Sequence, residues 1–407
     1  MFILHCDKCS SGCSGPGYKS PKAAILEGPR EKLMYVVCVH TDSNKSDVLC
    51  TVDIDPTSDD YCKIIHKLRM PYVGDELHHS GWNICSSCHG QSQKRNTLVL
   101  PCLMSDRVYF IDTTNERAPS MKKVLNSTEI NQYGVSTLHT SHCSPNREIL
   151  ISTLGKPNGD AMGEFLCIDA ETLKVKGTWS TGTKRAMFGY DFWYQPYHDV
   201  LVATEWGVPR IFKRGYAITD SYDPAIYGRS LNFYSWNKRE LKQVLNLGED
   251  GIAPLEIRFL HDPKASEGFV GCAVTSNVYK FYKTSNAEWI AKKVIQIPPK
   301  QVEGWIAPQM SGRRLYGSPQ MLQLSLDGTR LYVTTSIFKP WDQQFYPEHV
   351  KYGSTMIKLD VDVINGGLKL DEEFLVDFGK EKNDILLAHE MRYPGGDCTS
   401  DIWLSVD

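Results

Sequence analysis

The sequence lacks a strong charge of either sign, long apolar runs and most helical patterns. It has 45 Lys and Arg against 48 Asp and Glu, a net charge of −3, without the basic surface that binds nucleic acids or anionic membranes. No stretch approaches the roughly 18 apolar residues of a spanning helix, and the opening MFIL is too short for a signal peptide. We expect a cytoplasmic protein, with nuclear or peripheral membrane association as alternatives, and no nucleic-acid partner.

Motifs of several large enzyme classes are also missing. The chain has no G-x-S-x-G elbow, no G-x-x-x-x-G-K-[ST] loop and no dinucleotide fingerprint. Its 13 cysteines are an odd number spread over 407 residues, unlike the framework of a small secreted domain. We interpret most of them as reduced thiols buried in strands.

A strand-rich unit recurs along the sequence. SPNREILISTLG (144–155) with EFLCIDAETLKVKGTW (164–179) matches SLDGTRLYVTTS (325–336) with TMIKLDVDVINGGLKL (355–370), and looser copies lie between them. Each unit has alternating, β-branched and aromatic segments divided by Gly, Asp, Asn or Pro turns. Repetition of a three- or four-stranded unit predicts an all-β fold, a β-propeller.

The two ends of the repeat region complement each other. Residues 32–70 supply outer strands without an opening strand, whereas residues 384–404 supply an opening strand without outer strands. We therefore predict that the C-terminal strands join the first blade and close the ring, which removes exposed sheet edges. The predicted organisation is a Cys-rich N-terminal extension at 1–31 and one propeller domain at 32–407.

Histidines gather where the repeats begin. The openings LHHSGW (77–82), LHTSH (138–142), LEIRFLH (255–261) and LAHEMRYPGGD (387–397) carry them. Opening strands line the axis of a propeller, so these side chains should converge there, and several imidazoles can hold copper, zinc or iron. The predicted metal ligands are His78, His79, His139, His142, His261 and His389.

Carboxylates near the same openings could orient the imidazoles from behind. The candidates are Asp75, Glu76, Asp191, Glu256 and Glu390. The alternative is that each histidine only caps a strand and bonds neighbouring backbone.

The CSSC at residues 85–88 remains open to several interpretations. It lacks the strand–helix context of a thioredoxin motif. A tetrathiolate zinc site would need a second pair, for which CDKC with Cys6 and Cys9 is the candidate. Cys85 and Cys88 could otherwise be soft ligands near the histidines, or ordinary loop cysteines.

Taken together, these motifs resemble the selenium-binding protein family, also known as methanethiol oxidases. The resemblance rests on DELHHSGWNICSSC, LHTSHC, GYDFWYQP, PLEIRFLH, GFVGCA, WDQQFYP, FLVDFGKE, AHE and YPGGDC, and it runs from about residue 15 to 404. It implies a seven-bladed propeller that oxidises methanethiol with O2 and water to formaldehyde, hydrogen sulfide and hydrogen peroxide.

The resemblance also implies cofactors and roles. It implies copper as the metal and selenium bound through a cysteine, which corresponds to Cys62 in DDYCKIIHK. In the C-terminal opening, Glu390, Asp397 and Cys398 are candidates for catalytic proton transfer, with turn and supporting roles as the alternative. The expected partners are a small thiol and O2, and protein partners stay open.

One departure from the family concerns the number of blades. Family members carry a further repeat where this chain passes directly from Met310 to Ser311, so the sequence encodes about six blades. The missing repeat keeps a second function open, that of a non-catalytic selenium- or thiol-binding protein or scaffold, for example in intracellular protein transport.

Overall fold

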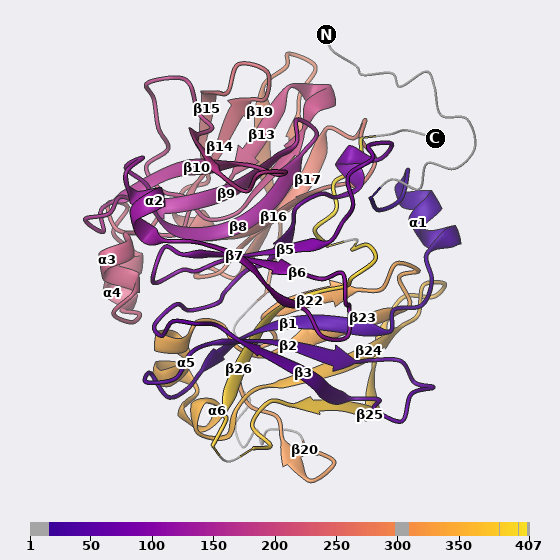
Figure 1. Cartoon of the computed structure of the whole chain (residues 1–407). Helices are drawn as coiled ribbons and strands as arrows, with labels where there is room; N and C mark the ends of the chain where they lie inside the picture. Colours follow the sequence, from indigo (N-terminus) through magenta and orange to yellow (C-terminus); the bar gives the residue numbers. More distant parts are fainter. Residues whose placement is uncertain (1–15, 298–308, 382, 398, 405–407) are drawn as a thin grey trace.

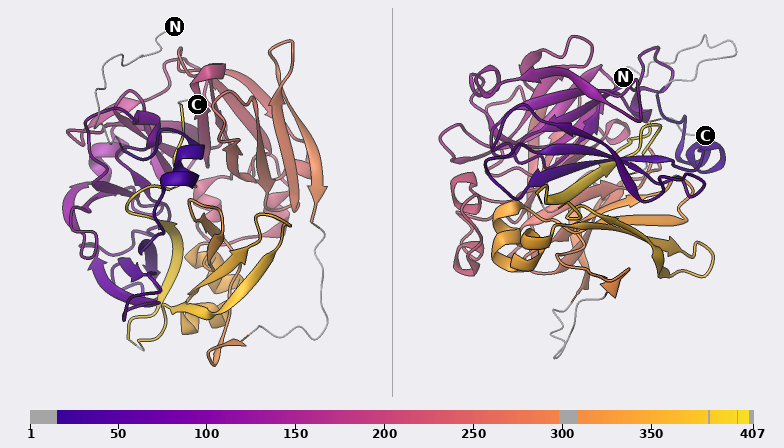
Figure 2. Two further views of the ribbon diagram at one scale, coloured as in Figure 1. Left: turned by 90° about the vertical axis from the view of Figure 1, so that its right-hand side faces the viewer. Right: turned by 60° about the horizontal axis from the view of Figure 1, so that its bottom comes forward.

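Six antiparallel sheets of four strands stand in a ring in the computed structural model of the chain (Figure 1). The structure describes residues 16–297, 309–381, 383–397 and 399–404. Each sheet is one blade, and its first strand lies toward the centre of the ring (Figure 2). The chain is therefore a β-propeller with six blades, as the repeat count predicts.

The blades follow one another in chain order, and the one exception is the inner strand of blade 1. Blade 1 is β26 (Leu386–Arg392), β1 (Leu33–His40), β2 (Val48–Asp53) and β3 (Lys63–Arg69); blade 2 is β4 (Gly81–Trp82), β5 (Thr97–Pro101), β6 (Val108–Asp112) and β7 (Ser120–Leu125); blade 3 is β8 (Ser136–Ser144), β9 (Glu148–Gly155), β10 (Ala161–Asp169) and β11 (Val175–Thr178).

The second half of the ring has the same plan. Blade 4 is β12 (Phe192–Gln195), β13 (Val200–Ala203), β14 (Ser230–Ser235) and β15 (Glu240–Asn246); blade 5 is β16 (Pro254–Phe259), β17 (Glu267–Cys272), β18 (Asn277–Lys283) and β19 (Trp289–Gln296); blade 6 is β22 (Met321–Leu324), β23 (Arg330–Thr334), β24 (Thr355–Val361) and β25 (Leu368–Asp377). A two-stranded hairpin, β20 (Gln309–Met310) and β21 (Arg313–Arg314), precedes blade 6.

Blade 1 is built from both ends of the chain. Its inner strand β26 pairs antiparallel with β1, Tyr35 opposite Arg392 and His40 opposite Leu386. This pairing satisfies the inner edge of β1, which would otherwise expose unpaired backbone groups.

Local sequence explains why the segments form hairpins. Between β22 and β23 the turn SLDG places Gly328 at φ 74°, and the Asp327 carboxylate accepts hydrogen bonds from Thr329 N and Ser325 Oγ. Glycine adopts this left-handed conformation without steric cost, and Asp stabilises turns through its side chain. The flanking strands supply the alternating apolar residues that pack between blades.

Hydrophobic clusters join most neighbouring blades. Separate clusters join blades 1 and 2, blades 2 and 3, blades 3, 4 and 5, and blades 6 and 1. Among the described residues, no cluster contains strand residues of both blade 5 and blade 6. In Figure 2 the ribbons of these two blades stand apart.

The chain also forms short helices outside the blade strands. They are α1 (Pro21–Glu27), α2 (Ser127–Asn131), α3 (Pro209–Phe212), α4 (Ile218–Ser221), α5 (Lys339–Phe345) and α6 (Pro347–Tyr352), with 3₁₀ turns at Ser86–Cys88, Pro196–His198 and Glu249–Gly251. The insertions of blades 4 and 6 meet where Trp341 Nε1 donates to Phe212 O at 3.1 Å. None of the described helices has the length and apolar character to cross a membrane.

Candidate metal centre

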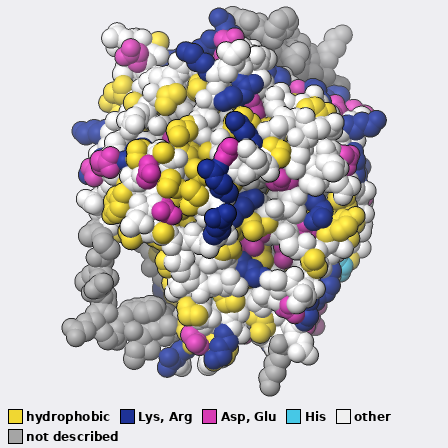
Figure 3. Space-filling model, turned by 90° about the vertical axis from the view of Figure 1, so that its left-hand side faces the viewer, with side chains coloured by type: hydrophobic (Ala, Val, Ile, Leu, Met, Phe, Trp, Pro, Cys, Tyr) yellow, Lys and Arg dark blue, Asp and Glu magenta, His cyan; other side chains and the backbone are white. Residues whose placement is uncertain are grey.

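Four of the six predicted histidine ligands meet near the axis of the ring. His78 and His79 lie just before β4 and are separated from it by Ser80, whereas His139 lies on β8 and His389 on β26, so blades 1, 2 and 3 build the cluster. All four side chains are at most 3% exposed. Almost no histidine surface is visible on the face of the molecule in Figure 3.

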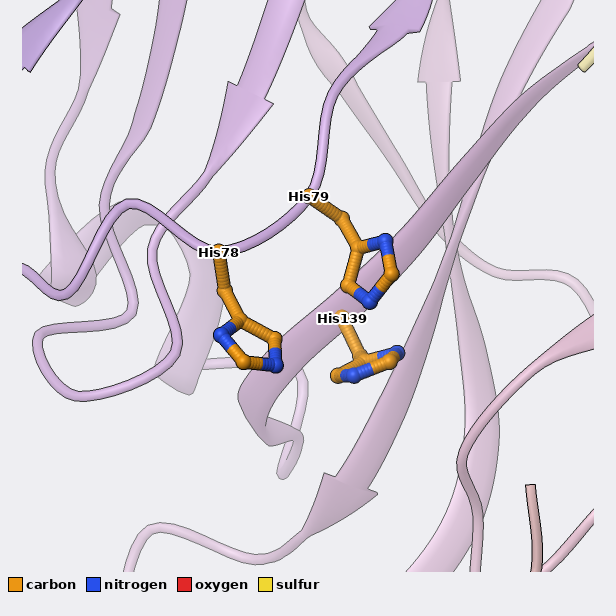
Figure 4. A group of neighbouring side chains, drawn as sticks. All are labelled: His78, His79 and His139. Atoms are coloured by element: carbon orange, nitrogen blue, oxygen red, sulfur yellow. The ribbon is translucent and has the colours of Figure 1, made fainter. Parts of the chain in front are cut away.

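The rings are close enough to share one ion. One ligand nitrogen from each of His78, His79 and His139 lies within 4.8 Å of the other two, and Figure 4 shows these three rings converging. The ring of His389 stacks on that of His78, with 3.9 Å between centroids.

Irregular strand pairing helps to direct two of these side chains. The register of β8 against β9 shifts between Leu138 and Ser141, around His139. The register of β1 against β26 shifts opposite the segment that contains His389. A β-bulge turns a side chain away from its regular orientation, and bulges are frequent beside functional sites.

Hydrogen bonds fix three of the rings through one nitrogen and leave the other without a partner. His79 Nδ1 bonds to Glu390 Oε1 at 2.9 Å, His139 Nδ1 to Thr140 Oγ1 at 3.0 Å, and His389 Nδ1 to Ser336 O at 2.6 Å. The Nε2 atoms of all three are buried and make no hydrogen bond in the structure. Metal-binding histidines show this pattern, since the outer bond sets ring orientation and the inner nitrogen binds the ion. The residues therefore fit a metal.

Burial keeps most of the cluster in the metal-binding, neutral form. It lowers the pKa of His78 and His139 well below the ordinary value, and that of His389 to about 3; neighbouring imidazoles reinforce the effect. His79 differs: burial lowers its pKa, but the Glu390 charge and hydrogen bond outweigh burial and raise it. The site thus favours one positive charge beside Glu390, whether a proton or a metal ion.

Glu390 is the carboxylate that is hydrogen-bonded to this histidine cluster. Burial raises its pKa, but the charges of Arg392 and His79 outweigh burial and hold the pKa of this carboxyl well below its usual range. Its other hydrogen bonds come from Ser80 N, Ser80 Oγ at 3.1 Å and Arg392 Nη2 at 2.6 Å. Arg392 was not among the predicted site residues, although its place two residues after Glu390 puts both on one face of β26.

Aromatic rings close the cluster on one side. The Tyr190 ring lies 3.9 Å from the ring of His139, and the Phe338 ring 6.1 Å from that of His78. Both belong to a buried hydrophobic cluster with Trp206 and Phe212. Both rings are buried and so cover this side of the centre. The motif GYDFWY contains Tyr190, and from the sequence we interpret its aromatic residues as packing between blades. Its position at a repeat opening was the signal that could have placed Tyr190 at the site.

The donor set narrows the choice of metal. Imidazole nitrogens suit copper, zinc, iron and nickel, whereas Mg²⁺ and Ca²⁺ prefer oxygen ligands. A three- or four-imidazole site therefore points to a transition metal and does not by itself select copper.

The other two predicted ligands lie apart from the four. The ring contacts of His142 are with Phe192 and Trp193, both at 5.1 Å, and its Nε2 is buried without a hydrogen bond. His261 follows β16 and packs against Trp403 at 4.8 Å. Metal binding by these two residues stays a prediction.

Among the five candidate carboxylates, only Glu390 is hydrogen-bonded to a histidine in the described part of the chain. Asp75 binds Tyr109 and Arg107, Glu76 accepts from Lys339 N, and Asp191 and Glu256 both bind Arg258. Hydroxyl, amide and guanidinium donors bind these carboxylates instead, although Glu256 Oε1 is buried without a hydrogen-bond partner. An orienting role for these four carboxylates stays a prediction.

The CSSC segment forms a small buried thiol cluster with a third cysteine. Cys85 directly precedes the 3₁₀ turn Ser86–Cys88 and Cys88 ends it, and Cys85 Sγ lies 2.8 Å from Cys143 Sγ on β8. Cys88 Sγ contacts Ser144 O at 3.3 Å. The nearest thiol neighbour of Cys85 thus comes from the next blade. The zinc partner pair, Cys6 and Cys9, lies outside the described residues.

The remaining predicted site residues lie in two places. Asp397 is buried and its Oδ1 accepts hydrogen bonds from Thr399 N at 2.8 Å and Ser400 N at 3.2 Å, which stabilises a turn. Cys398 lies outside the described residues. Cys62 directly precedes β3, the outermost strand of blade 1, with φ 63° and partial exposure.

Comparisons with known proteins agree with this architecture. The family model for the 56 kDa selenium-binding protein matches residues 12–313 and 307–404. A methanethiol oxidase of Xenopus laevis is 46% identical, covering 98% of this chain and 100% of that protein; selenium-binding protein 2 of Mus musculus is 43% identical, with 98% and 99% covered. The crystal structure of a hypothetical selenium-binding protein from Sulfolobus tokodaii has a TM-score of 0.86 and 34% identity, with 95% and 98% covered.

The same comparisons locate the shortened region. The alignment with the Xenopus laevis protein runs over 474 positions, although this chain has only 407 residues. The two family matches meet at 307–313. Relatives therefore carry a segment that this chain lacks, and the break falls where the sequence predicts a missing repeat.

Proposed function

Because the chain belongs to the 56 kDa selenium-binding protein family, we propose that it oxidises methanethiol with O2 and water to formaldehyde, hydrogen sulfide and hydrogen peroxide. The reaction balances, since two electrons leave the methanethiol carbon and reduce O2 to peroxide, while water supplies the aldehyde oxygen. The observation that carries the proposal is the set of three buried Nε2 atoms on His79, His139 and His389 without hydrogen-bond partners.

We propose copper as the resident metal, held by His78, His79, His139 and His389. The all-nitrogen donor set supports this choice, because imidazole suits copper. When bound, a copper ion would supply Lewis acidity toward sulfur and electron transfer to O2. His142 and His261 stay second candidates as ligands.

The surrounding residues have defined tasks in this proposal. Glu390 orients His79 and retains the proton on Nδ1, so that Nε2 faces the centre. Arg392 keeps Glu390 ionised. Tyr190 and Phe338 exclude bulk water, which strengthens electrostatic interactions within the centre. Direct proton transfer by Glu390, Asp397 or Cys398 remains a prediction.

We propose a separate selenium site at Cys62. Its thiol is the only partly exposed one among the nine cysteines that the structure describes, the other eight being buried. An accessible thiol is what a selenium compound needs in order to react. Burial raises the pKa of Cys62, so we expect the reaction to be faster at alkaline pH, where more thiolate is present.

Product analysis tests the oxidase proposal. Copper-loaded protein should convert methanethiol into equimolar formaldehyde, hydrogen sulfide and hydrogen peroxide, and chelator-treated protein should not. Copper-loaded protein that remains inactive would contradict the proposal. In that case the accessible Cys62 favours the second function, a non-catalytic selenium- or thiol-binding protein, and metal-free protein should still retain selenium unless Cys62 is replaced by Ser.

The role of Glu390 has its own test. Replacing Glu390→Gln should weaken copper binding by about 10- to 100-fold, because the outer partner of a ligating histidine is lost. The electron paramagnetic resonance spectrum of bound Cu²⁺ should also change, which a merely structural role would not cause. Glu164→Gln is the matched control, since this buried carboxylate binds Arg185 and Ser180 in blade 3. Equal copper affinity in both variants would contradict the positioning role.

A further inference from the structure

Three buried cysteine thiols meet where blade 2 packs against blade 3. Cys85 and Cys88 belong to the segment between β4 and β5, and Cys143 lies on β8. All three are at most 4% exposed, and together with Ile84 they form a hydrophobic cluster of their own. The oxidase function proposed above uses none of these thiols.

Two of the three sulfur atoms face each other directly. Cys143 Sγ donates a hydrogen bond to Cys85 Sγ over 2.8 Å. Disulfide sulfurs lie about 2.05 Å apart, so a movement of less than about 1 Å separates this contact from a covalent bond. Cys88 Sγ is directed elsewhere, since it donates to Ser144 O at 3.3 Å. The geometry therefore favours a pair across two blades over a pair within CSSC.

The hydrogen bond makes the two thiols unequal. Burial raises the pKa of Cys85, but the hydrogen bond from the Cys143 thiol outweighs burial and lowers it. Cys143 keeps its proton in this bond, because it is the donor. The thiolate is the nucleophilic form of cysteine, so Cys85 is the sulfur that attacks first.

A serine hydroxyl lies among the three sulfurs. Ser87 Oγ is 3.2 Å from Cys85 Sγ, 3.6 Å from Cys143 Sγ and 3.7 Å from Cys88 Sγ. In this position it can donate a hydrogen bond to an oxygen atom that leaves Cys85. The 3₁₀ turn continues directly into residues 89–94, which are partly or largely exposed. The thiols thus lie close to a surface loop.

We propose that Cys85 and Cys143 form a reversible disulfide between blades 2 and 3 when the protein meets hydrogen peroxide. The Cys85 thiolate attacks one peroxide oxygen: an S–O bond forms, the O–O bond breaks, and the departing hydroxide takes up the proton that Cys85 released. Cys143 then attacks this oxidised sulfur: the S–S bond forms, the S–O bond breaks, and hydroxide leaves with the Cys143 proton as water. Overall, two thiols and one hydrogen peroxide give one disulfide and two waters, and two electrons pass from sulfur to oxygen.

The position of the pair gives the disulfide a structural role. Strand β8 carries both Cys143 and His139, and Cys85 follows the segment of His78 and His79 and β4. The disulfide therefore ties together the two segments that supply three of the clustered histidines. It also links residues that are 58 positions apart. A cross-link over such a loop stabilises a fold chiefly by restricting the unfolded chain.

Peptide mapping tests the pairing. The reduced full-length protein is treated with a small excess of hydrogen peroxide, its remaining thiols are alkylated during denaturation, and it is digested with trypsin. Trypsin leaves Cys85 and Cys88 in one peptide, 70–94, and Cys143 in another, 124–147. The expected product is these two peptides joined by one disulfide. A disulfide within 70–94, or an oxidised Cys85 without a joined peptide, would overturn the proposal.

Serine variants identify the partner of Cys143. Cys88→Ser should still yield the joined peptides, whereas Cys85→Ser should not. Cys272→Ser is the matched control and should behave as wild type, since this thiol is also buried but lies on β17 of blade 5. If Cys85→Ser does not fold, fragmentation of the joined wild-type peptides locates the bond at Cys85 or at Cys88. A bond at Cys88 would overturn the assignment.

Thermal unfolding tests the structural role. Peroxide-treated wild type should have a Tm about 5 °C above that of the reduced protein, as expected for a loop of this length. Dithiothreitol should restore the original Tm, and Cys85→Ser should show no rise. Joined peptides with an unchanged Tm would rule out the stabilising role. A fall in Tm would show that peroxide damages the fold instead, as oxidation of buried Met and Cys does.

Discussion

Blade 3 and blade 5 share a strand plan but differ in how their second strands are buried. All eight residues of β9 in blade 3 are buried. In β17 of blade 5, buried and more exposed residues alternate, and Phe269 is 42% exposed. The reason is how each blade packs against its neighbouring blades. Clusters join blade 3 to both neighbours, whereas in the described part of the chain strand residues of blade 5 share clusters only with blades 3 and 4.

The same difference divides the ring into two sides. We call blades 1 to 4 the enclosed side and blades 5 and 6 the open side. Blade 6 resembles blade 5, because Leu322 on β22 is also half exposed. A blade therefore folds as a four-stranded sheet whether one or both faces are covered, and the neighbouring blade decides how much apolar surface is buried.

The two sides also differ in chemistry. All four clustered histidines come from the enclosed side, on or beside inner strands of blades 1, 2 and 3. The open side carries a cavity between β16 and β22, lined by Glu256, Arg258 and His261 among others. We infer that a metal centre can persist without a further blade, because none of the four clustered histidines belongs to blades 5 or 6.

The largest expected difference between the sides is in metal binding. His79→Ala should lower copper affinity by at least about 100-fold, because a buried ligand and the partner of Glu390 are lost together. His261→Ala, on the open side, should retain its copper. Plasma mass spectrometry of copper-loaded variants measures this. Equal copper content in the two variants would contradict this difference between the two sides, and His261 would again be a candidate ligand.

The next difference concerns packing. Leu150→Ala on β9 should lower the free energy of unfolding by about 2–5 kcal/mol, as expected for a cavity in a well-packed core. Phe269→Ala on the open face of β17 should cost less than about 1 kcal/mol. Urea denaturation followed by circular dichroism gives both values. A large cost for Phe269→Ala would mean that a second molecule covers this face.

The smallest expected effect depends on pH and lies where β26 joins blade 1. Asp384, two residues before this strand, binds Lys67 at 2.9 Å and also Arg69, both on β3. Burial raises the pKa of Asp384, but these bonds outweigh burial and lower it to about 2. The pKa is lower in the folded than in the unfolded chain, where it is about 4. The stabilisation is therefore present above about pH 4 and is lost as pH falls towards 2.

Asp384→Asn should thus lower the free energy of unfolding at pH 7 by about 1–2 kcal/mol, with the difference from wild type shrinking below about pH 4. Thermal unfolding at several pH values measures this. Glu288→Gln, in the exposed turn between β18 and β19 of the open side, is the control and should have no such effect. A difference that stays constant down to pH 2 would contradict the proposed ion pairing.

Much of the fold could be predicted from the sequence, because its signals are local. Alternating apolar residues and Asp-Gly turns specify hairpins, and their recurrence specifies blades. Histidines at the repeat openings predict an axial cluster, and Glu390 was among the predicted supporting carboxylates. The missing repeat was predicted from the resemblance, since the family carries a further repeat where this chain passes directly from Met310 to Ser311.

The tertiary structure alone decided which histidines meet and that a cavity lies between blade 5 and blade 6. His139 and His142 lie on the same strand, yet only His139 joins the cluster, because side-chain direction depends on a bulge and on the neighbouring blade. The sequence gives each strand an inward and an outward face through its period of two. What each face contacts depends on segments far away in the chain, and so the cavity between β16 and β22 has no local signal.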